Sequence, residues 1–401
     1  MMIIKSTRIY MEDGVHSGGL RIKNGRVAEF LERPGEDGSC GDRQDIVDVG
    51  DNRVIPGIID THNHGTCGYN LMSGGNVDTV RGYLKACASQ GITGIFPTPS
   101  TDMIRMVADA AKEGCDGAQI LGIHSEGPWL NRTGEKGIRT GWPEVSMETA
   151  EQMLEDSQGL LKLVALAPEI PGIDGIIRYF LEHDVVVACA HSDCNFKEAR
   201  AAYGKGLSVA THTGNVMTGL HHRDLGGLGA ALLTDQVDCE VICDGMHISL
   251  EMLKLYFRVK DTSRFLMISD CTSFSGAPEG WYRGMEPGMK IQMKDGFVLT
   301  DTGRLMGSSQ PVLYGVKNLV EELHMPMEQA LRMSSWNAAR KYGFETRKGS
   351  LRVGKDADFV VISDDYQALS TYVNGRKVYD RELEPEVFNP DFLTEMALEE
   401  A

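Results

Sequence analysis

The stretch VIPGIIDTHNHG, residues 54–65, places an apolar run directly before two histidines, His62 and His64. An apolar run with β-branched residues and a Pro-Gly break is typical of a buried strand. Side chains two positions apart in an extended strand project from the same side, so both imidazoles can reach one ion. We therefore expect a strand that ends in a candidate metal-binding pair.

Similar apolar runs alternate with amphipathic stretches along the middle of the chain. The predicted strands are Val54–Asp60, Gly94–Pro97, Ile120–His124, Lys162–Ala167, Val185–Ala190, Leu207–Thr211, Glu240–Cys243 and Arg264–Ser269. The predicted helices are Asp78–Gln90, Asp102–Lys112, Met147–Asp156, Gly172–His183, Phe196–Tyr203 and Leu250–Val259. Eight such alternations in about 290 residues favour an α/β fold of the (β/α)8 TIM-barrel type over a doubly wound sheet.

The two ends of the chain have a different sequence pattern, which predicts short strands separated by Asn-Gly and Asp-Gly turns. Examples are GGLRIKNGRVAEFL at residues 18–31 and KGSLRVGKDADFVVI at residues 348–362. Such turns between alternating apolar residues are typical of β-hairpins. We expect residues 1–53 and 346–385 to form one small β-sandwich domain, residues 54–345 to form the catalytic barrel, and residues 386–401 to be an acidic tail.

Composition limits the class of protein. Apolar residues make up 42% and charged residues 24%, and no apolar run of about 18 residues occurs, so we expect a soluble globular protein with no membrane partner. The N-terminus does not resemble a signal peptide, and the nine cysteines include no C-x-x-C pair, which favours a reducing cytoplasm. The net charge of −17 argues against nucleic acid as a partner and leaves a small anionic substrate open.

Polar side chains end four further predicted strands. Glu126 lies in ILGIHSEGP, His191 in VVVACAHSD and His212 in LSVATHTGN, each just after an apolar run, and Asp270 closes RFLMISD. The C-terminal ends of all TIM-barrel strands meet at one face, where active sites are built. A carboxylate on a buried strand is costly unless it is paired or bound to metal. Gathered there with His62 and His64, these residues predict a metal site, although each alone could be a hydrogen-bonded structural residue or a helix cap.

The predicted chemistry is amide hydrolysis by a metal-activated water, with Asp270 as the base that takes the proton of the water and passes it to the leaving nitrogen. Nitrogen and oxygen ligands favour zinc, and iron, manganese or cobalt would also fit. The sequence leaves open whether one or two ions bind. Hydantoinase-type enzymes bridge two metals with a carboxylated lysine on strand 4, but LVALAPE at residues 163–169 has none, so Glu126 is the natural bridging or sole carboxylate ligand.

An ordered set of motifs between about residues 50 and 365 resembles the N-acetylglucosamine-6-phosphate deacetylase family of the amidohydrolase superfamily. The motifs are PGIIDTHNHG, GITGIFPT, GIHSEGPWLN, KGIR, AHSD, THTGNVM, HHRDLGG, VICDGMH, MISD, GRLMGSS, WNAARKYG and KGSLRVGKDADFVVI. The resemblance implies a metal-dependent barrel with a split β domain. It also implies removal of the N-acetyl group from a phosphorylated amino sugar, giving acetate and an amino-sugar 6-phosphate.

Carried over by position, the resemblance implies roles for individual residues. The residues implied to hold the principal metal are Glu126, His191 and His212. His62 and His64 match a pair that can hold a second ion. Asp270 matches the catalytic aspartate.

The resemblance also implies substrate contacts. Asn215 and the backbone of Val216 match the site of the sugar phosphate, and His247 matches a substrate-contacting histidine. Arg223 matches an arginine lent to that phosphate by a neighbouring subunit, which implies a homodimer.

The chain departs from the family pattern in two places. Arg139 stands where the family has a histidine that polarises the scissile carbonyl, and arginine cannot shuttle a proton. Thr213-Gly214 replaces a bulky apolar pair, and Val216 replaces alanine. These changes leave open a different N-acyl or cyclic amide substrate, including that of a deaminase. A non-catalytic barrel is a third alternative, although it predicts lost ligands where here every position is filled.

Overall fold

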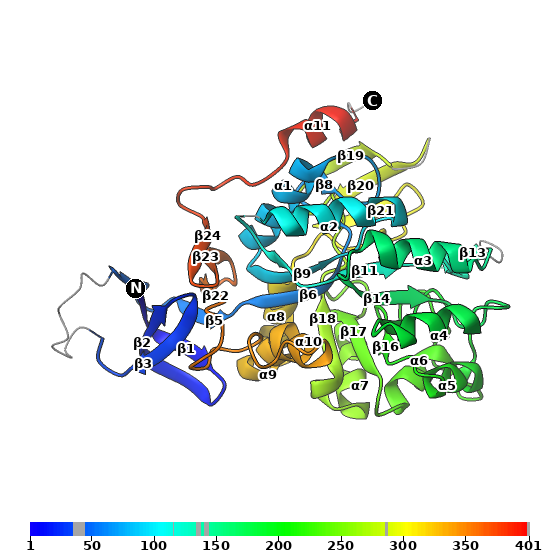
Figure 1. Ribbon diagram of the computed structural model, residues 1–401, viewed down its shortest axis with the longest axis horizontal. Helices are drawn as coiled ribbons and strands as arrows, with labels where there is room; N and C mark the ends of the chain where they lie inside the picture. The colour runs from blue at the N-terminus through cyan, green and yellow to red at the C-terminus, as the bar shows by residue number, and fades with distance from the viewer. Residues whose placement is uncertain (35–44, 115, 134–137, 140–143, 285–287, 399–401) are drawn as a thin grey trace.

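The central feature is a barrel of eight parallel strands in a computed structural model that describes residues 1–34, 45–114, 116–133, 138–139, 144–284 and 288–398. Figure 1 shows the barrel with its helices around it and the small β domain at one side. The predicted TIM barrel is thus confirmed. Its strands are β6 (Ile58–Asn63), β9 (Ile92–Pro97), β11 (Ile123–Glu126), β14 (Leu161–Leu166), β15 (Val186–Cys189), β16 (Val209–Ala210), β17 (Asp238–Ile242) and β18 (Phe265–Ile268).

Backbone hydrogen bonds close the barrel between its first and last strands. The amide of Asp270 donates to the carbonyl of His62 at 2.9 Å, and that of His64 donates to Cys271 at 2.8 Å. Strands β11 and β14 to β18 form one continuous parallel run, and β6 pairs with β9 and β9 with β10 (Gln119–Ile120). The seam between β6 and β18 therefore holds the ends of these two strands together, where His62, His64 and Asp270 lie.

The six predicted helices are present within a few residues of their expected limits. They are α1 (Val77–Ser89), α2 (Ile104–Glu113), α3 (Met147–Asp156), α4 (Asp174–Glu182), α5 (Phe196–Gly204) and α7 (Leu250–Val259). Asn76 and Asn195 cap α1 and α5 with capping boxes, which fixes where these helices begin. Helices that the sequence did not predict are α6 (Gly226–Leu233), α8 (Val312–Lys317), α9 (Met327–Leu331) and α10 (Asn337–Lys341), with π-helical turns at Asn318–Glu322 and Arg332–Trp336 and 3-10 turns at Thr101–Met103 and Thr262–Arg264.

The single strand predicted at Val54–Asp60 is in fact two strands, separated at Gly57. The first, β5 (Arg53–Pro56), pairs with strand β22 of the small domain, and the second, β6, belongs to the barrel. A Cβ atom on Gly57 would lie 2.1 Å from the hydroxyl of Thr93, so the close approach of β6 to β9 requires glycine at the crossing.

Strands from both ends of the chain form one sheet in the small domain. They are β1 (Met2–Met11), β2 (Gly14–Lys23), β3 (Arg26–Leu31), β4 (Asp45–Asp48), β5, β22 (Phe359–Ile362), β23 (Ala368–Val373) and β24 (Arg376–Asp380). The amide of Val27 donates to the carbonyl of Lys355 at 2.9 Å, which brings the β3 edge round to the segment before β22. The sheet thus curls around its own apolar core. The domain limits drawn from the sequence remain predictions.

Short strands that the sequence did not predict surround the mouth of the barrel. They are the hairpin of β7 (Gly65–Thr66) and β8 (Tyr69–Asn70), the pair β12 (Arg132–Thr133) and β13 (Ile138–Arg139), and the sheet of β19 (Gly280–Arg283), β20 (Lys290–Lys294) and β21 (Phe297–Thr300). Helix α11 (Pro390–Met396), in the segment expected to be an acidic tail, packs Phe392 against Phe274 beside this sheet. The apolar cluster thereby fixes Phe274 near the mouth.

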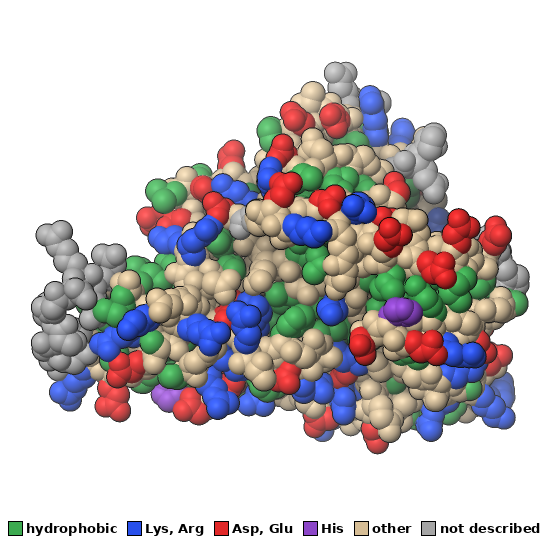
Figure 2. Space-filling model, viewed as in Figure 1, with side chains coloured by type: hydrophobic (Ala, Val, Ile, Leu, Met, Phe, Trp, Pro, Cys, Tyr) green, Lys and Arg blue, Asp and Glu red, His purple; other side chains and the backbone are tan. Residues whose placement is uncertain are grey.

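The surface carries both signs of charge. Figure 2 shows acidic and basic side chains interspersed over one face rather than gathered in a single basic patch. In the part of the chain that the structure describes, we find no helix with the length and apolar character needed to cross a bilayer.

Candidate active site

A cavity of about 250 Å³ opens at the C-terminal ends of the barrel strands. Side chains and backbone from the loops after six barrel strands and from the barrel-mouth hairpin line it: His64, Asn70, Met72, Glu126, His191, His212, Asn215, Val216, His247, Asp270, Thr272, Ser273, Phe274, Leu305, Met306 and Gly307. Four of the five predicted metal ligands and the predicted catalytic aspartate are among them.

Glu126, at the end of β11, lies at the centre of the site. Its Oε1 atom is 3.0 Å from Nε2 of His191 and 2.8 Å from Nε2 of His212. The two imidazole nitrogens are 3.1 Å from each other. One carboxylate oxygen and two imidazole nitrogens therefore converge, although the residues are separated by up to 86 positions in sequence.

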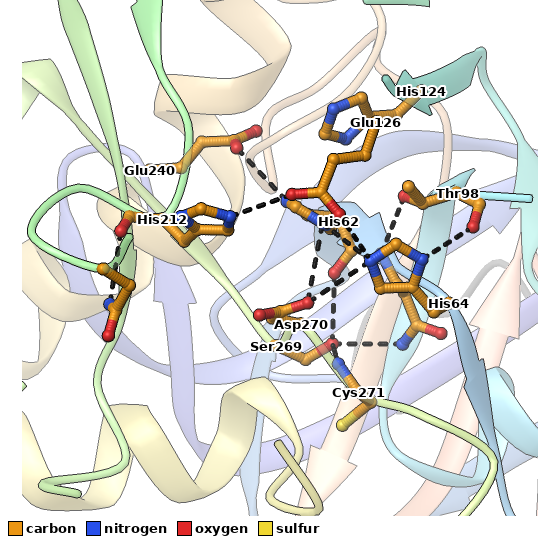
Figure 3. Close-up of polar contacts among 12 residues, drawn as sticks. His62, His64, Thr98, His124, Glu126, His212, Glu240, Ser269, Asp270 and Cys271 are labelled. Atoms are coloured by element: carbon orange, nitrogen blue, oxygen red, sulfur yellow. Dashed lines mark hydrogen bonds and ion pairs between the residues drawn. The ribbon is translucent and has the colours of Figure 1, made fainter. Parts of the chain in front are cut away.

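The other oxygen of Glu126 faces a second pair of histidines. Its Oε2 atom is 3.1 Å from Nε2 of His64 and 3.7 Å from Nε2 of His62. The Nε2 atoms of His62 and His64 are 3.1 Å apart, as expected for residues on the same side of β6. Figure 3 shows the carboxylate between His212 on one side and the pair of His62 and His64 on the other.

Both groups of donor atoms fit a divalent cation. Two ligand atoms bound tetrahedrally at about 2.1 Å lie about 3.4 Å apart, and the corresponding distances here range from 2.8 to 3.7 Å. Nδ1 of His64 lies 2.9 Å from the carbonyl of Thr98, and Nδ1 of His191 lies 2.6 Å from that of Arg132. A ring that donates through Nδ1 presents a lone pair at Nε2, which is the form that binds metal.

The electrostatics of this cluster also favour a cation. Burial by itself would raise the pKa of Glu126, but His191 and His62 outweigh it and hold that pKa well below the usual 4.5. Burial would lower the pKa of His62, but the carboxylates of Asp270 and Glu126 raise it well above 6.5. The pKa of His191 is raised against burial by Glu126 in the same way. The carboxylates thus create a field that stabilises positive charge among these rings.

Asp270 follows β18 and reaches the same place from the strand beside β6. Its Oδ1 atom is 3.5 Å from Nε2 of His62 and 3.6 Å from Nε2 of His64. The neighbouring Ser269 donates its hydroxyl to the buried carboxylate of Asp60 at 2.6 Å, which ties this end of β18 to β6. The arrangement leaves the Asp270 carboxylate at the cavity wall, next to the histidine pair.

Left-handed backbone conformations aim several of these side chains. The φ angles are 46° at His191, 30° at His212, 50° at Val216 and 52° at Asp270. Residues other than glycine seldom adopt positive φ, and each such residue costs on the order of 1–3 kcal/mol. Three strand ends therefore turn sharply where the candidate site is formed, which is where strained residues cluster in enzymes.

Three of the residues expected to contact substrate lie at the cavity, and Arg223 does not. Asn215, Val216 and His247 line the cavity. Asp244 orients His247, because its Oδ2 atom lies 2.7 Å from Nδ1 of that ring. Arg223 is exposed in the loop closed by the bridge between His221 and Asp224, away from the lining of the cavity of its own chain.

The two departures from the family pattern lie in different surroundings. Arg139 pairs with Arg132 in the strands β12 and β13, but its side chain lies outside the described part of the structure. Thr213 is buried and donates its hydroxyl to Ala210 at 3.0 Å. A Cβ atom on Gly214, where φ is +98°, would lie 2.3 Å from the hydroxyl of Tyr256. The Thr213-Gly214 change therefore lies behind the cavity wall, and Tyr256 fills the space beside it.

Sequence reasoning missed three polar residues that support the site. Glu240 lies 3.5 Å from Nδ1 of His62, His124 packs against His62, and Asp244 holds His247. Each carried a signal: Glu240 is a carboxylate within the apolar strand CEVIC, His124 precedes Glu126 by two positions, and Asp244 stands three residues before His247.

Comparison with known proteins finds relatives of this chain both by sequence and by fold. The model of the family described as "Amidohydrolase family" matches residues 53–378. The chain is 35% identical to the N-acetylglucosamine-6-phosphate deacetylase of Vibrio furnissii over 85% of this chain and 86% of that protein. It is 29% identical to the N-acetylgalactosamine-6-phosphate deacetylase of Escherichia coli O157:H7, covering 93% and 98%. Its fold is similar to that of the N-acetylglucosamine-6-phosphate deacetylase of Pasteurella multocida, with a TM-score of 0.84 at 27% identity over 94% and 99% of the two chains.

Proposed function

The chain belongs to the amidohydrolase family, within its N-acetylglucosamine-6-phosphate deacetylase group, and on this premise we propose how its site hydrolyses the N-acetyl group of a hexosamine 6-phosphate. The observation that carries the proposal is the position of Asp270, beside two groups of histidines that share Glu126 at the wall of one cavity. Acetate and an amino-sugar 6-phosphate are the products of this reaction.

The enzyme uses a divalent metal, and the residues proposed to hold it are Glu126, His191 and His212, with His62 and His64 for a second ion. A cation held there would lower the pKa of a water molecule and polarise the amide carbonyl. Zinc suits this set of imidazole and carboxylate donors, and we propose it as the native metal.

Asp270 is proposed to move the proton. Its carboxylate takes a proton from the attacking water and then gives that proton to the departing nitrogen, so that the amine leaves in a neutral form. The Asp270 position, 3.5 and 3.6 Å from the histidine pair, keeps the carboxylate next to the site of attack. Its backbone is fixed by the hydrogen bond from its amide to His62 and by the bond from the Ser308 amide to its carbonyl at 2.7 Å.

The rest of the cavity is proposed to hold the sugar. Asn215 and the backbone of Val216 line the cavity and are proposed to bind the phosphate, and His247 also lines it, with its ring fixed by Asp244. Phe274 and Met306 supply apolar surface suited to the acetyl methyl group. Arg139 is proposed to contact the carbonyl or phosphate from the β12–β13 pair, where its charge would be permanent.

We further propose a homodimer in the cytoplasm, with Arg223 completing the phosphate site of the neighbouring subunit. Arg223 is exposed between Leu220 and Leu225, which are themselves 40% and 38% exposed. Two exposed leucines beside a cation suit a contact with another chain. The seven described cysteines are all free thiols, which is in keeping with a reducing compartment.

A turnover comparison tests the function. N-acetylglucosamine 6-phosphate, N-acetylgalactosamine 6-phosphate and the two unphosphorylated sugars are supplied to the zinc-loaded enzyme, and released acetate is measured. We expect the phosphorylated sugars to be hydrolysed with a kcat/KM well above that of the unphosphorylated sugars, and N-acetylglucosamine 6-phosphate to be preferred. Preferred turnover of a cyclic ureide or an aminopurine in a parallel assay would instead support the cyclic amidase or deaminase alternative.

A further inference from the structure

A buried carboxylate that the proposed mechanism does not use lies directly behind His62. Glu240 is in the middle of β17, between Cys239 and Val241, and none of its surface is exposed. Successive side chains of a strand project to opposite sides. Cys239 and Val241 pack into the apolar core around the barrel, so Glu240 projects into the barrel interior. A carboxylate there is costly unless other polar groups satisfy it.

The contacts of Glu240 point toward the histidine pair. Its Oε1 atom accepts a hydrogen bond from the hydroxyl of Thr61 at 2.9 Å, and its Oε2 atom lies 3.5 Å from Nδ1 of His62. Figure 3 shows this contact on the side of the His62 ring away from His64. Among the described residues, neither the Oε2 atom nor Nδ1 of His62 has a hydrogen-bond partner, although both are buried.

His124 brings a third buried group to the same place. Its Nδ1 atom donates to the carbonyl of Thr61 at 3.0 Å, which leaves Nε2 as an acceptor. That Nε2 atom is buried and also has no partner within the described chain. Ligand atoms of His62, His124 and Glu240 lie within 4.8 Å of one another, and the rings of His62 and His124 are 4.5 Å apart at their centroids.

The contacts of these three groups suit a proton on Nδ1 of His62 rather than a further cation. A proton on Nδ1 of His62 faces the Oε2 atom of Glu240 at 3.5 Å, and the carboxylate stabilises the ring in that form. A cation would need the Nδ1 lone pair of His62. Because Nε2 of the same ring faces Glu126 and Asp270, such binding would leave His62 with metal on both nitrogens and no proton.

We propose that Glu240 is a positioning residue: from behind the ring and beside His124, it holds His62 with its proton on Nδ1, so that Nε2 binds the second metal ion. A carboxylate behind a ligating imidazole fixes its tautomer and raises its basicity, and loss of such a partner typically lowers metal affinity by about 10- to 100-fold. This inference rests on the metal site of the proposed function, and it assigns the second ion a supporting carboxylate.

Metal titration of Glu240→Gln tests the proposal, with Cys239→Ala as the matched control. The two residues are neighbours on β17 but face opposite sides, so the control disturbs the same strand without touching His62. Each protein is dialysed against buffers of graded free zinc, bound zinc is measured by atomic spectroscopy, and anomalous diffraction at the zinc edge locates it.

We expect two ions per chain in the unaltered enzyme and in Cys239→Ala. We expect Glu240→Gln to keep the ion at Glu126, His191 and His212 while its affinity for the ion at His62 and His64 falls by roughly 10- to 100-fold. Thr61→Val, which removes the hydroxyl that holds Glu240, should weaken the same ion to a lesser degree. The crystal structure of the unaltered enzyme should show Nε2 of His62 on the zinc and Nδ1 of the same ring facing Glu240.

Retention of both ions at unaltered affinity in Glu240→Gln would overturn the proposal, as would a parallel loss of both ions together with a fall in melting temperature. An unaltered enzyme that takes only one ion at every zinc concentration would also overturn it. Ion binding is measured without substrate, so an enzyme that takes two ions as expected but releases no acetate would refute the proposed function and leave this inference standing.

Discussion

At the scale of single residues, Glu126 connects the two halves of the candidate metal centre. One of its oxygens faces His191 and His212, and the other faces His62 and His64. Asp270 approaches only the second pair. The carboxylate proposed to hold the metal and the carboxylate proposed to move a proton are therefore separate residues, and their substitutions should have separable effects.

Replacing Asp270 by asparagine should lower kcat by roughly 10²- to 10⁴-fold, the usual contribution of a positioned acid–base group. The amide keeps the shape of the side chain but cannot accept the proton of the water. Zinc content should stay unaltered, because the proposed ligands are other residues. Steady-state kinetics with parallel metal analysis measures both quantities, and near-normal turnover would remove this role from Asp270.

The ionised carboxylate of Asp244 should contribute to the free energy of unfolding, and acid should remove that contribution. Burial alone would raise the pKa of Asp244, but its hydrogen bond with His247 and the charge of that ring hold the pKa below 3.8. Since the folded-state pKa is depressed, the contribution is present above about pH 4 and is lost as pH falls through the folded value. Asp244→Asn lacks this contribution.

Urea denaturation at several pH values between about 3 and 6 measures the effect as the difference between the two proteins. The free energy of unfolding should fall more steeply below pH 4 in the unaltered protein than in Asp244→Asn. Equal slopes would show that Asp244 titrates alike in the folded and unfolded states. The same variant should raise KM for substrate, because His247 would lose the group that orients it.

The sequence predicted which side chains gather at the site but not which groups support them. Glu126, His191, His212 and Asp270 each end an apolar run, and the barrel brings such ends together. The contact of Glu240 with His62 depends instead on the register of β17 relative to β6 across the barrel. No pattern within either strand determines that register.

At the scale of elements, the strand–helix alternation predicted the barrel, and the additions at its mouth were missed. One of them carried a signal: Asp295-Gly296 separates the runs KIQMK and FVLT, an arrangement typical of a tight hairpin. Both residues have positive φ, 52° and 76°, as that turn requires. The packing of α11 on this sheet could not be predicted, because it joins Phe392 to Phe274 and Tyr282, more than 100 positions earlier.

Helix α11 should stabilise the cavity wall through Phe392. This side chain is 6% exposed and its ring is 5.3 Å from that of Phe274, which lines the cavity. Phe392→Ala should cost about 3–5 kcal/mol of local stability, as other large-to-small core substitutions do. It should raise KM while zinc content is retained, because Phe274 would lose its support.

Thermal denaturation and steady-state kinetics measure these two effects. Leu383→Ala is the matched control from the same C-terminal segment, since Leu383 is 78% exposed. An unaltered KM in Phe392→Ala would show that Phe274 keeps its position without α11.

At the scale of the whole molecule, the net charge of −17 poses a problem for an enzyme with a phosphorylated substrate. Like charges repel at long range, so binding needs cationic groups and backbone donors close to the phosphate. Asn215 and Val216 can supply hydrogen bonds within the chain, and Arg223 lies away from its own cavity. A second subunit that supplies Arg223 would resolve this imbalance.

Mixing two defective chains tests whether Arg223 acts across a subunit boundary. Arg223→Ala alone should raise KM for the phosphorylated sugar and alter turnover of the unphosphorylated sugar little, and Asp270→Asn alone should lower kcat. In a mixed dimer, the chain with intact Asp270 receives Arg223 from its partner, so one of its two sites is complete. Random exchange of equal amounts makes about half of the dimers mixed, and activity should therefore recover to about a quarter of the unaltered value. If Arg223 served its own chain, no site in any mixed dimer would be complete, and the mixture would be no more active than the average of its two components.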